Sequence, residues 1–390
     1  MKVLLTGGGS GGHITPVTSI AREIKTINSS TEIIYIGQKN DKLSALLKKN
    51  TDLDKVYLIY AGKFRRYHYE GLKQLLDFPT ILKNVRDTFL ILIGFLQALF
   101  IIRKNNPDIL FTRGGYLSVP VALAAKLNGV PYITHDSDSI SSLTNKIIAP
   151  GAKVNAISID SKHHNYPKNK KVLVGVPVSS EFIHVTDELK NEYRNSLGLS
   201  RETKVLLVIG GGLGSVSINQ AVLRIAKPLL NSFEDLVIFH IVGIKNLQKM
   251  KKEYEGVMEH DNRIKLLDFV DDVYKYSGAA DVIVTRAGAT NLAEFSIQAK
   301  PCIIIPSPYL TGGHQLKNAE FIAEHDAGLI IQEDDIVQKS DVLLKSIMKL
   351  LNDDDLRLRL SKNISKIAIS GATRKLAELI LSESSGGHKI

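Results

Sequence analysis

The chain has 390 residues, of which 44% are apolar and 23% charged, so it can bury sizeable cores and is not a disordered tail. The single cysteine, Cys302, excludes a disulfide-stapled secreted fold and a zinc–thiolate cluster. The net charge of +10 is uneven, because residues 1–180 carry 24 Lys and Arg against 12 Asp and Glu, whereas residues 181–390 carry 26 against 28. The first half is therefore expected to meet an anionic partner.

Short β-branched runs alternate with segments of helical spacing along the chain. In the first half, strands are predicted at 3–6, 32–36, 55–60, 109–112, 132–134 and 172–174. In the second half, strands are predicted at 204–209, 236–242, 265–268, 281–285 and 302–305. This alternation predicts an α/β fold with two doubly wound domains, residues 1–174 and 175–352, joined near a Gly-Val-Pro-Val turn. Two helices are expected within 353–390, where a terminal helix could pack back on the first domain.

One apolar run, TFLILIGFLQALFII at 88–102, is 15 residues long and too short to span a bilayer comfortably. No transmembrane helix is expected, the apolar start of the chain is too short for a signal peptide, and a reducing cytoplasmic location follows. Upstream of the run lies a basic and aromatic cluster with Lys63, Arg65 and Arg66. Two interpretations stay open: a helix lying at an anionic lipid surface, or a helix buried in the first domain.

Three glycine turns each stand between a predicted strand and a helix: 7–12, followed by His13; 114–115; and 210–214. Glycine lets the backbone approach a ligand closely, and the free N–H groups at the start of a helix favour anions. No Gly-Lys-Ser/Thr follows these glycines, which disfavours a P-loop NTPase. The second strand lacks the acidic residue that would hold the ribose of NAD, so a dehydrogenase ranks low.

Several segments resemble, in order, motifs of the MurG family of UDP-N-acetylglucosamine (UDP-GlcNAc) transferases, glycosyltransferase family 28. They are GGGSGGHITP, TRGGYLSVPVALAAKLNGVPYITHD, SLTNKIIAP, GGGLGSVSINQ, DVIVTRAGATNLAE and GGHQLKNA. The resemblance implies a GT-B fold, two Rossmann-like domains with the active site in the cleft. It also implies inverting transfer of GlcNAc to undecaprenyl-diphosphate-MurNAc-pentapeptide (lipid I), giving lipid II in peptidoglycan synthesis.

The resemblance also assigns roles to residues. His13 and His135 are the candidate catalytic residues; a capping or packing role is the alternative for His13. Glu294 matches the residue that binds the ribose, Gln315 matches one that contacts the sugar hydroxyls, and Val270 stands beside the uracil. The expected donor-binding residues are Ser10, Gly11, Gly12, Asp138, Ser179, Gly212, Leu213, Val270, Arg286, Ala289, Thr290, Glu294 and Gln315. The expected acceptor and membrane residues are Gly114, Gly115, Tyr116, Lys63, Arg65 and Arg66.

The chain departs from the family at three places. Residues 135–138 read His-Asp-Ser-Asp where the family has HEQN, Ser179 stands for an arginine that contacts the donor, and Gly212-Leu213 stand for Ser-Gln. Another UDP-sugar:lipid transferase, or a noncatalytic relative that binds nucleotide or lipid, therefore remains an alternative. No obligatory metal or other cofactor is expected, although Asp136 and Asp138 leave a metal open. The expected partners are UDP-GlcNAc, the undecaprenyl-linked acceptor and an anionic membrane at the cytoplasmic face, not nucleic acid.

Overall fold

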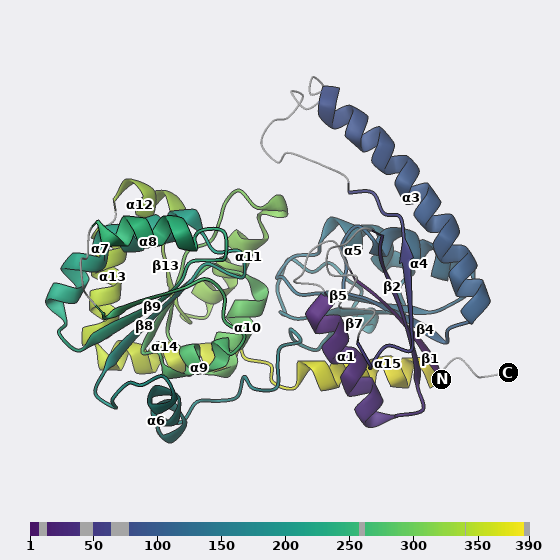
Figure 1. Cartoon of the computed structure of the whole chain (residues 1–390). Coiled ribbons are helices and arrows are strands. Elements are labelled where there is room, and N and C mark those ends of the chain that lie inside the picture. Colours follow the sequence, from purple (N-terminus) through teal and green to yellow (C-terminus); the bar gives the residue numbers. More distant parts are fainter. Residues whose placement is uncertain (8–13, 40–49, 64–77, 257–261, 340, 386–390) are drawn as a thin grey trace. The chain divides into compact units, whose positions relative to one another are not determined.

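The computed structural model describes residues 1–7, 14–39, 50–63, 78–256, 262–339 and 341–385 (Figure 1). The chain divides into two compact units: unit 1 is Met1–Ser179 with Gly371–Ile390, and unit 2 is Ser180–Ser370. The predicted joint at 174/175 lies close to this division. Each unit has its own parallel sheet with helices on both faces, which confirms the predicted α/β class.

Unit 1 contains a seven-stranded parallel sheet in the order β3-β2-β1-β4-β5-β6-β7. Its strands are β1 Lys2–Thr6, β2 Glu32–Gln38, β3 Lys55–Ile59, β4 Ile109–Thr112, β5 Tyr132–Asp136, β6 Val154–Ile157 and β7 Lys171–Leu173. The sequence prediction missed β6, because VNAI places a polar residue inside a run of only four. The polar residue, Asn155, is buried, and its Oδ1 accepts a hydrogen bond from Thr134 Oγ1 at 2.7 Å.

The helices of unit 1 cover both faces of this sheet (Figure 1). On one face, α1 (Ile14–Ile27) and α15 (Ala372–Ser385) lie against each other and share a core with β1, β2 and β4. On the other face, α3 (Phe78–Asn105), α4 (Ser118–Leu127) and α5 (Leu143–Ile148) pack. The apolar sides of these helices are thereby removed from water, which stabilises the sheet.

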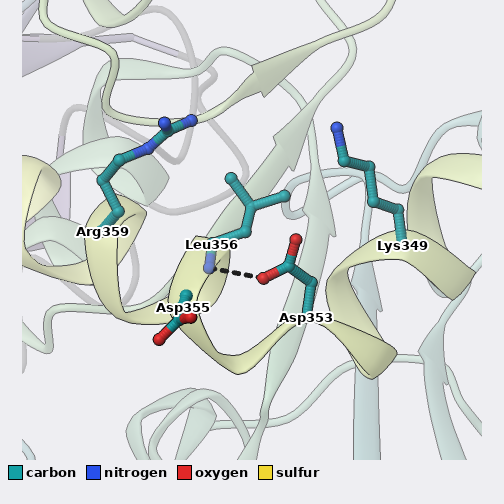
Figure 2. A pocket seen from close by; sticks show the side chains of 5 residues that line it. All are labelled: Lys349, Asp353, Asp355, Leu356 and Arg359. Carbon is teal, nitrogen blue, oxygen red and sulfur yellow. Dashed lines mark hydrogen bonds between the residues drawn. The ribbon is translucent and has the colours of Figure 1, made fainter.

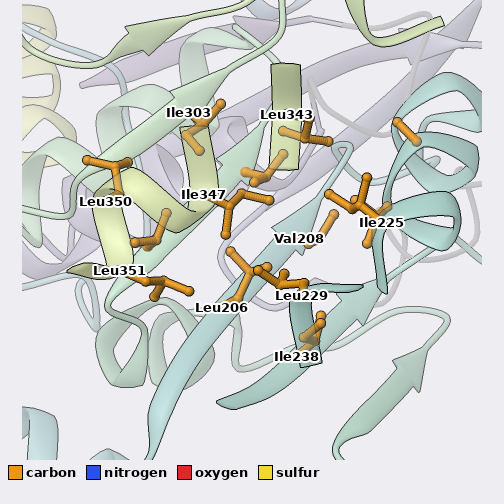
Figure 3. Close-up of a cluster of buried hydrophobic side chains, with 14 of the residues drawn as sticks. Leu206, Val208, Ile225, Leu229, Ile238, Ile303, Leu343, Ile347, Leu350 and Leu351 are labelled. Atoms are coloured by element: carbon orange, nitrogen blue, oxygen red, sulfur yellow. The ribbon is translucent and has the colours of Figure 1, made fainter. Parts of the chain in front are cut away.

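Unit 2 contains a six-stranded parallel sheet in the order β10-β9-β8-β11-β12-β13. Its strands are β8 Lys204–Ile209, β9 Leu236–Ile241, β10 Ile264–Leu267, β11 Val282–Thr285, β12 Cys302–Ile304 and β13 Leu329–Ile330. Its helices are α6 Asp187–Ser196, α7 Val216–Ser232, α8 Leu247–Glu255, α9 Val273–Ala279, α10 Ala289–Ile297, α11 His314–Glu324, α12 Glu333–Gln338, α13 Asp341–Asn352 and α14 Asp354–Lys366. The core between α7, α13 and the sheet is a continuous apolar cluster (Figure 3).

The two helices expected within 353–390 belong to different units. Helix α14 belongs to unit 2, where Leu356 and Leu360 join the cluster of Figure 3 and Ile364 joins the core on the other face of the sheet. Helix α15 belongs to unit 1, where Leu376 and Ile380 pack against α1. Gly371, with a φ of +68°, lies in the turn between the two helices, where only glycine adopts this backbone conformation without strain.

Helix α3 is longer than the apolar run from which it was predicted. Its 28 residues continue through Arg86 and Asp87, and Thr80–Asn105 is long and apolar enough to cross a membrane by length and composition. The sequence prediction made this apolar segment too short, because it stopped at the first charged residues. The alternative of a helix buried in the first domain is wrong for most of α3, since only 22% of its most apolar stretch is buried.

Candidate functional site

The glycine turn at 210–214 lies at the carboxyl end of β8, in unit 2. Gly211 and Gly214 have φ values of +90° and +75°, and the Gly214 N–H donates to the Gly211 carbonyl at 2.8 Å. Ser215 caps α7 by accepting the N–H of Ile218. Gly212 and Leu213, at the tip, are exposed, and 85% of Leu213 is accessible. A close-approach turn before a helix N-terminus is suited to a diphosphate.

Arg286, a predicted donor residue, directly follows the neighbouring strand β11 and is bonded to several parts of unit 2. Its side chain is 11% exposed, and its guanidinium donates to Ser215 Oγ and Ser217 Oγ, both at 2.7 Å, and to the Ile305 carbonyl at 3.1 Å. It also forms an ion pair with Glu333 at the start of α12. Burial opposes ionisation of Glu333, but its bonds from Arg286 and Ser217 outweigh the burial and lower its pKa. Arg286 therefore holds the glycine turn, β11 and α12 together.

Helix α10 follows this strand end and carries three predicted residues. Ala289 is buried at its first position, and Thr290 is half-buried beside it. Glu294, about one turn further on, is also half-buried, and desolvation raises the pKa of its carboxyl to about 8. Among the described residues, no hydrogen bond or ion pair involves this carboxyl group. A carboxyl held without a protein partner is available to accept ligand hydroxyls.

Two further predicted residues come after strands of the same sheet, Val270 after β10 and Gln315 after β12. Gln315 is buried in the first turn of α11, and its Oε1 accepts the N–H of Ser307 at 2.9 Å. This bond fixes the orientation of the amide and leaves its Nε2 as the group able to meet a ligand. Val270 is half-buried and packs against the apolar core beside β10. The loops and helices that follow the strands of this one parallel sheet thus carry Gly212, Leu213, Arg286, Ala289, Thr290, Glu294, Gln315 and Val270.

The glycine turn of unit 1 that the structure describes follows β4. Gly114 and Gly115 have φ values of +83° and +85°, and Ser118 Oγ donates to the Gly114 carbonyl at 2.6 Å. The hydroxyl of Tyr116 donates to Gln38 Oε1 at the end of β2. The turn is therefore preformed by its own hydrogen bonds, with Tyr116 fixed at one side.

His135, the second catalytic candidate, is not placed to act as a base. Its ring is completely buried at the end of β5, and Nε2 lies 3.0 Å from both the Gly175 carbonyl and Ser158 Oγ. Burial, together with the nearby Arg113, lowers its pKa to about 3, so the imidazole is neutral at physiological pH. A base must reach the proton that it abstracts, and a buried ring cannot do so. We therefore assign His135 a structural role.

The two acidic residues after His135 differ in burial and in their hydrogen bonds. Asp136 is buried and accepts hydrogen bonds from Ser142 N at 3.2 Å, Asn145 Nδ2 at 2.7 Å and Tyr166 Oη at 2.5 Å. Asp138 is half-buried, and its carbonyl lies 3.1 Å from His164 Nε2. Among the described residues, no group of three His, Cys, Asp or Glu side chains is placed to hold a metal ion. Asp136 thus anchors the loop before α5.

The remaining candidates are surface residues or lie outside the described part of the chain. Ser10, Gly11, Gly12, His13, Arg65 and Arg66 fall outside the described residues. Lys63 and Ser179 are both exposed, the second as the last residue of the first segment of unit 1. Sequence reasoning missed Glu333, whose partner Arg286 is 47 positions away, and Tyr166, whose partner Asp136 is 30 away. Neither pair leaves a local sequence signal.

A separate surface hollow lies between α13 and α14, lined by Lys349, Asp353, Asp355, Leu356 and Arg359 (Figure 2). Asp353 Oδ1 accepts the N–H of Leu356 at 2.8 Å, which is an ordinary N-cap of α14. Nothing in this hollow distinguishes it from a capped helix start. The segments at the carboxyl ends of the strands of unit 2 therefore remain the candidate site.

Two parallel-sheet α/β units, each with glycine turns at the carboxyl ends of its strands, define the GT-B class of fold. Residues 3–157 match the glycosyltransferase family 28 N-terminal domain, and residues 205–376 match the glycosyltransferase family 28 C-terminal domain. The chain belongs to glycosyltransferase family 28.

Curated relatives match along almost the whole chain. The UDP-N-acetylglucosamine–N-acetylmuramyl-(pentapeptide) pyrophosphoryl-undecaprenol N-acetylglucosamine transferase of Geotalea daltonii is 32% identical, over 99% of this chain and 98% of its own. Transferase 1 of the same name from Bacillus thuringiensis is 31% identical, over 97% and 98%.

Solved structures agree in fold. MurG of Acinetobacter baumannii superposes with a TM-score of 0.74 at 23% identity, covering 98% of this chain and 99% of its own. The UDP-GlcNAc 2-epimerase of Neisseria meningitidis, bound to UDP-GlcNAc, gives a TM-score of 0.65 at 12% identity, covering 98% and 100%.

Proposed function

We propose that this enzyme transfers GlcNAc from UDP-GlcNAc to undecaprenyl-diphosphate-linked MurNAc-pentapeptide, forming lipid II for peptidoglycan synthesis. The names of its relatives support the reaction and both substrates. The observation that carries the donor assignment is Glu294 of α10, whose carboxyl group has no hydrogen bond or ion pair with the described residues. Ribose hydroxyls are donors that suit such an acceptor, and the exposed turn at Gly212 suits the diphosphate.

The proposed reaction is a single displacement at the anomeric carbon with inversion. The acceptor hydroxyl loses its proton to a base and attacks the sugar, while UDP departs with the bonding pair. We propose His13 as this base, because the other candidate, His135, is buried and has a lowered pKa. Backbone N–H groups at the N-termini of α7 and α10 would stabilise the negative charge that develops on the departing diphosphate.

Helix α3 supports a peripheral attachment of unit 1 to a lipid surface. Its apolar side chains follow helical spacing and are between 36% and 69% exposed: Ile81, Leu82, Val85, Phe89, Leu92, Ile93, Leu96 and Phe100. We call this set the α3 stripe. An apolar surface of this extent marks contact with lipid or protein. Exposed Lys83, Arg103 and Lys104 stand near its two ends, and cations so placed favour an anionic bilayer.

The contacts of α3 favour a helix lying on the membrane over one that spans it. A Cβ at Gly94 would lie 2.0 Å from the Tyr60 carbonyl oxygen, and one at Gly62 would lie 2.0 Å from the Asp87 carbonyl oxygen. The helix backbone therefore touches the segment after β3 directly, and Gln97 Oε1 accepts the Tyr60 N–H at 2.9 Å. A spanning orientation would break these contacts and carry the Asp87 carboxylate into hydrocarbon, which is costly.

Donor identity is tested by supplying the purified enzyme with lipid I and one labelled nucleotide sugar at a time. UDP-GlcNAc is expected to transfer its label to lipid, whereas UDP-glucose and UDP-N-acetylgalactosamine are expected to give little product. Preferred transfer of another sugar would favour a different UDP-sugar:lipid transferase. Tight UDP binding without any transfer would favour a noncatalytic relative.

A further inference from the structure

A chain of buried polar side chains lies behind the glycine turn of unit 2. It joins Tyr254 of α8, His240 of β9 and Asn219 of α7, which are 5%, 0% and 1% exposed. The distances are 3.0 Å from Tyr254 Oη to His240 Nδ1, 3.1 Å from His240 Nε2 to Asn219 Oδ1, and 3.0 Å from Asn219 Nδ2 to the Val242 carbonyl oxygen. Every polar side-chain atom of these three residues has a hydrogen-bond partner, as buried polar groups require.

The bond to the Val242 carbonyl fixes which group donates in each of the other two hydrogen bonds. The Val242 carbonyl can only accept, so the Asn219 amide donates to it and turns its own oxygen towards His240. His240 must then carry its proton on Nε2, which leaves Nδ1 to accept the hydroxyl of Tyr254. Burial lowers the pKa of His240 to about 3, which keeps the ring neutral and the tautomer fixed. The bonds all run one way, an arrangement in which each polarises the next.

The carbonyl at the end of this chain supports the turn. A Cβ at Gly214 would lie 2.0 Å from the Val242 oxygen, and a Cβ at Gly243 would lie 2.4 Å from the Leu213 oxygen. The turn and residues 242–243 therefore meet backbone to backbone, with no space for a side chain between them. Asn246 Nδ2 donates to the same Val242 oxygen at 2.8 Å. Any shift of Val242 must move Leu213 and Gly214 with it.

We propose that His240 is a positioning residue for the nucleotide diphosphate, acting through Asn219 and the Val242 carbonyl on the glycine turn. This inference rests on the proposed function, which places the diphosphate of the donor at that turn. His240 itself does not touch the ligand. It fixes the positions of the backbone N–H groups of the glycine turn. A small displacement of these groups would weaken diphosphate binding.

The test measures UDP binding to the full-length enzyme by isothermal titration calorimetry. His240→Phe keeps the ring volume and removes both hydrogen bonds, so it is expected to raise the Kd for UDP by about tenfold. His240→Gln retains an amide donor towards Asn219 and is expected to recover most of the affinity. Tyr254→Phe removes only the outer donor and is expected to raise the Kd by about twofold to threefold. It serves as the second variant if His240→Phe does not fold.

The matched control is Ile347→Ala on α13, in the cluster of Figure 3, which includes none of the three network residues. It is expected to lose stability and keep its Kd for UDP within about twofold of the wild type. If His240→Phe and Tyr254→Phe lose stability like this control and bind UDP like the wild type, the network is only structural and the proposal is wrong. Wild-type enzyme that does not bind UDP would instead overturn the proposed function.

Discussion

Helices α3 and α13 are both rich in apolar residues at helical spacing, but only one of them buries these residues. Leu343, Ile347 and Leu350 of α13 are fully buried against the sheet of unit 2 (Figure 3). On α3 the inner side buries Ala98 and Ile102, while the outer side stays apolar and open to solvent. A helix that covers a sheet needs one apolar side, so a second apolar side indicates a second apolar environment. This difference fits the proposal that unit 1 contacts lipid, whereas unit 2 keeps its apolar helix residues in its core.

The largest effect is expected from the α3 stripe itself. Replacing Leu82, Phe89 and Phe100 by Gln removes three side chains that are 64% to 69% exposed. Because burying each is worth about 1.5–3 kcal/mol, binding to anionic vesicles should fall at least about a hundredfold. Sedimentation with vesicles measures this. Urea unfolding should show a free energy within about 1 kcal/mol of the wild type, since no core contact is lost. Undiminished vesicle binding would remove the lipid role of α3.

The counterpart on α13 should behave in the opposite way. Ile347→Ala opens a cavity in the core of unit 2 and should lower the free energy of unfolding by about 2–5 kcal/mol. Vesicle binding of the folded protein should stay unchanged, because no helix in the described part of unit 2 exposes a comparable apolar face. Urea denaturation and sedimentation at a permissive temperature check both. A loss of vesicle binding in folded Ile347→Ala would show that the two units do not divide the work as proposed.

Glu294 tests the nucleotide side of the comparison. Glu294→Gln should weaken UDP-GlcNAc binding by about tenfold, because an amide cannot accept two ribose hydroxyls as a carboxylate does. The free carboxyl has a pKa of about 8 and is mostly protonated at pH 7, whereas ribose hydroxyls favour the ionised form. Donor binding should therefore release a proton, and affinity should rise from pH 7 and level off above about pH 8.

Calorimetry in buffers of different ionisation enthalpy measures that proton release. Glu294→Gln should abolish it and flatten the dependence of affinity on pH, while leaving vesicle binding unchanged. If the variant keeps both the wild-type affinity and the proton release, Glu294 does not bind the ribose.

The smallest effect is expected from a single cation beside the α3 stripe. Lys104→Gln removes one exposed charge, which near an anionic surface is worth about 1 kcal/mol, or about fivefold in vesicle binding. The loss should shrink as salt is raised, since exposed charges are screened. Vesicles of neutral lipid provide the control, because there Lys104→Gln should bind like the wild type. If Lys104→Gln weakened binding to neutral vesicles by the same factor, Lys104 would act through packing and not through its charge.

The parts that the sequence could predict are those with local signals. The two doubly wound units follow from short β-branched runs, and the turns at 114–115 and 211–214 follow from glycines between strand and helix. The burial of His135 could not be predicted, because it depends on Ser158 and Gly175 closing over the ring from distant positions. The Arg286–Glu333 pair is equally non-local. The exposure of the apolar side of α3 could not be predicted either, since periodicity shows which residues share a face but not whether anything covers that face.

The proposed transfer of GlcNAc to a lipid-linked acceptor is tested most directly by its product. The enzyme is incubated with UDP-GlcNAc and lipid I in anionic vesicles, and the lipid fraction is analysed by mass spectrometry. We expect the acceptor to gain the mass of one N-acetylhexosamine residue and become lipid II. Lipid I that stays unmodified while UDP-GlcNAc is bound, or that gains a different sugar, would contradict it.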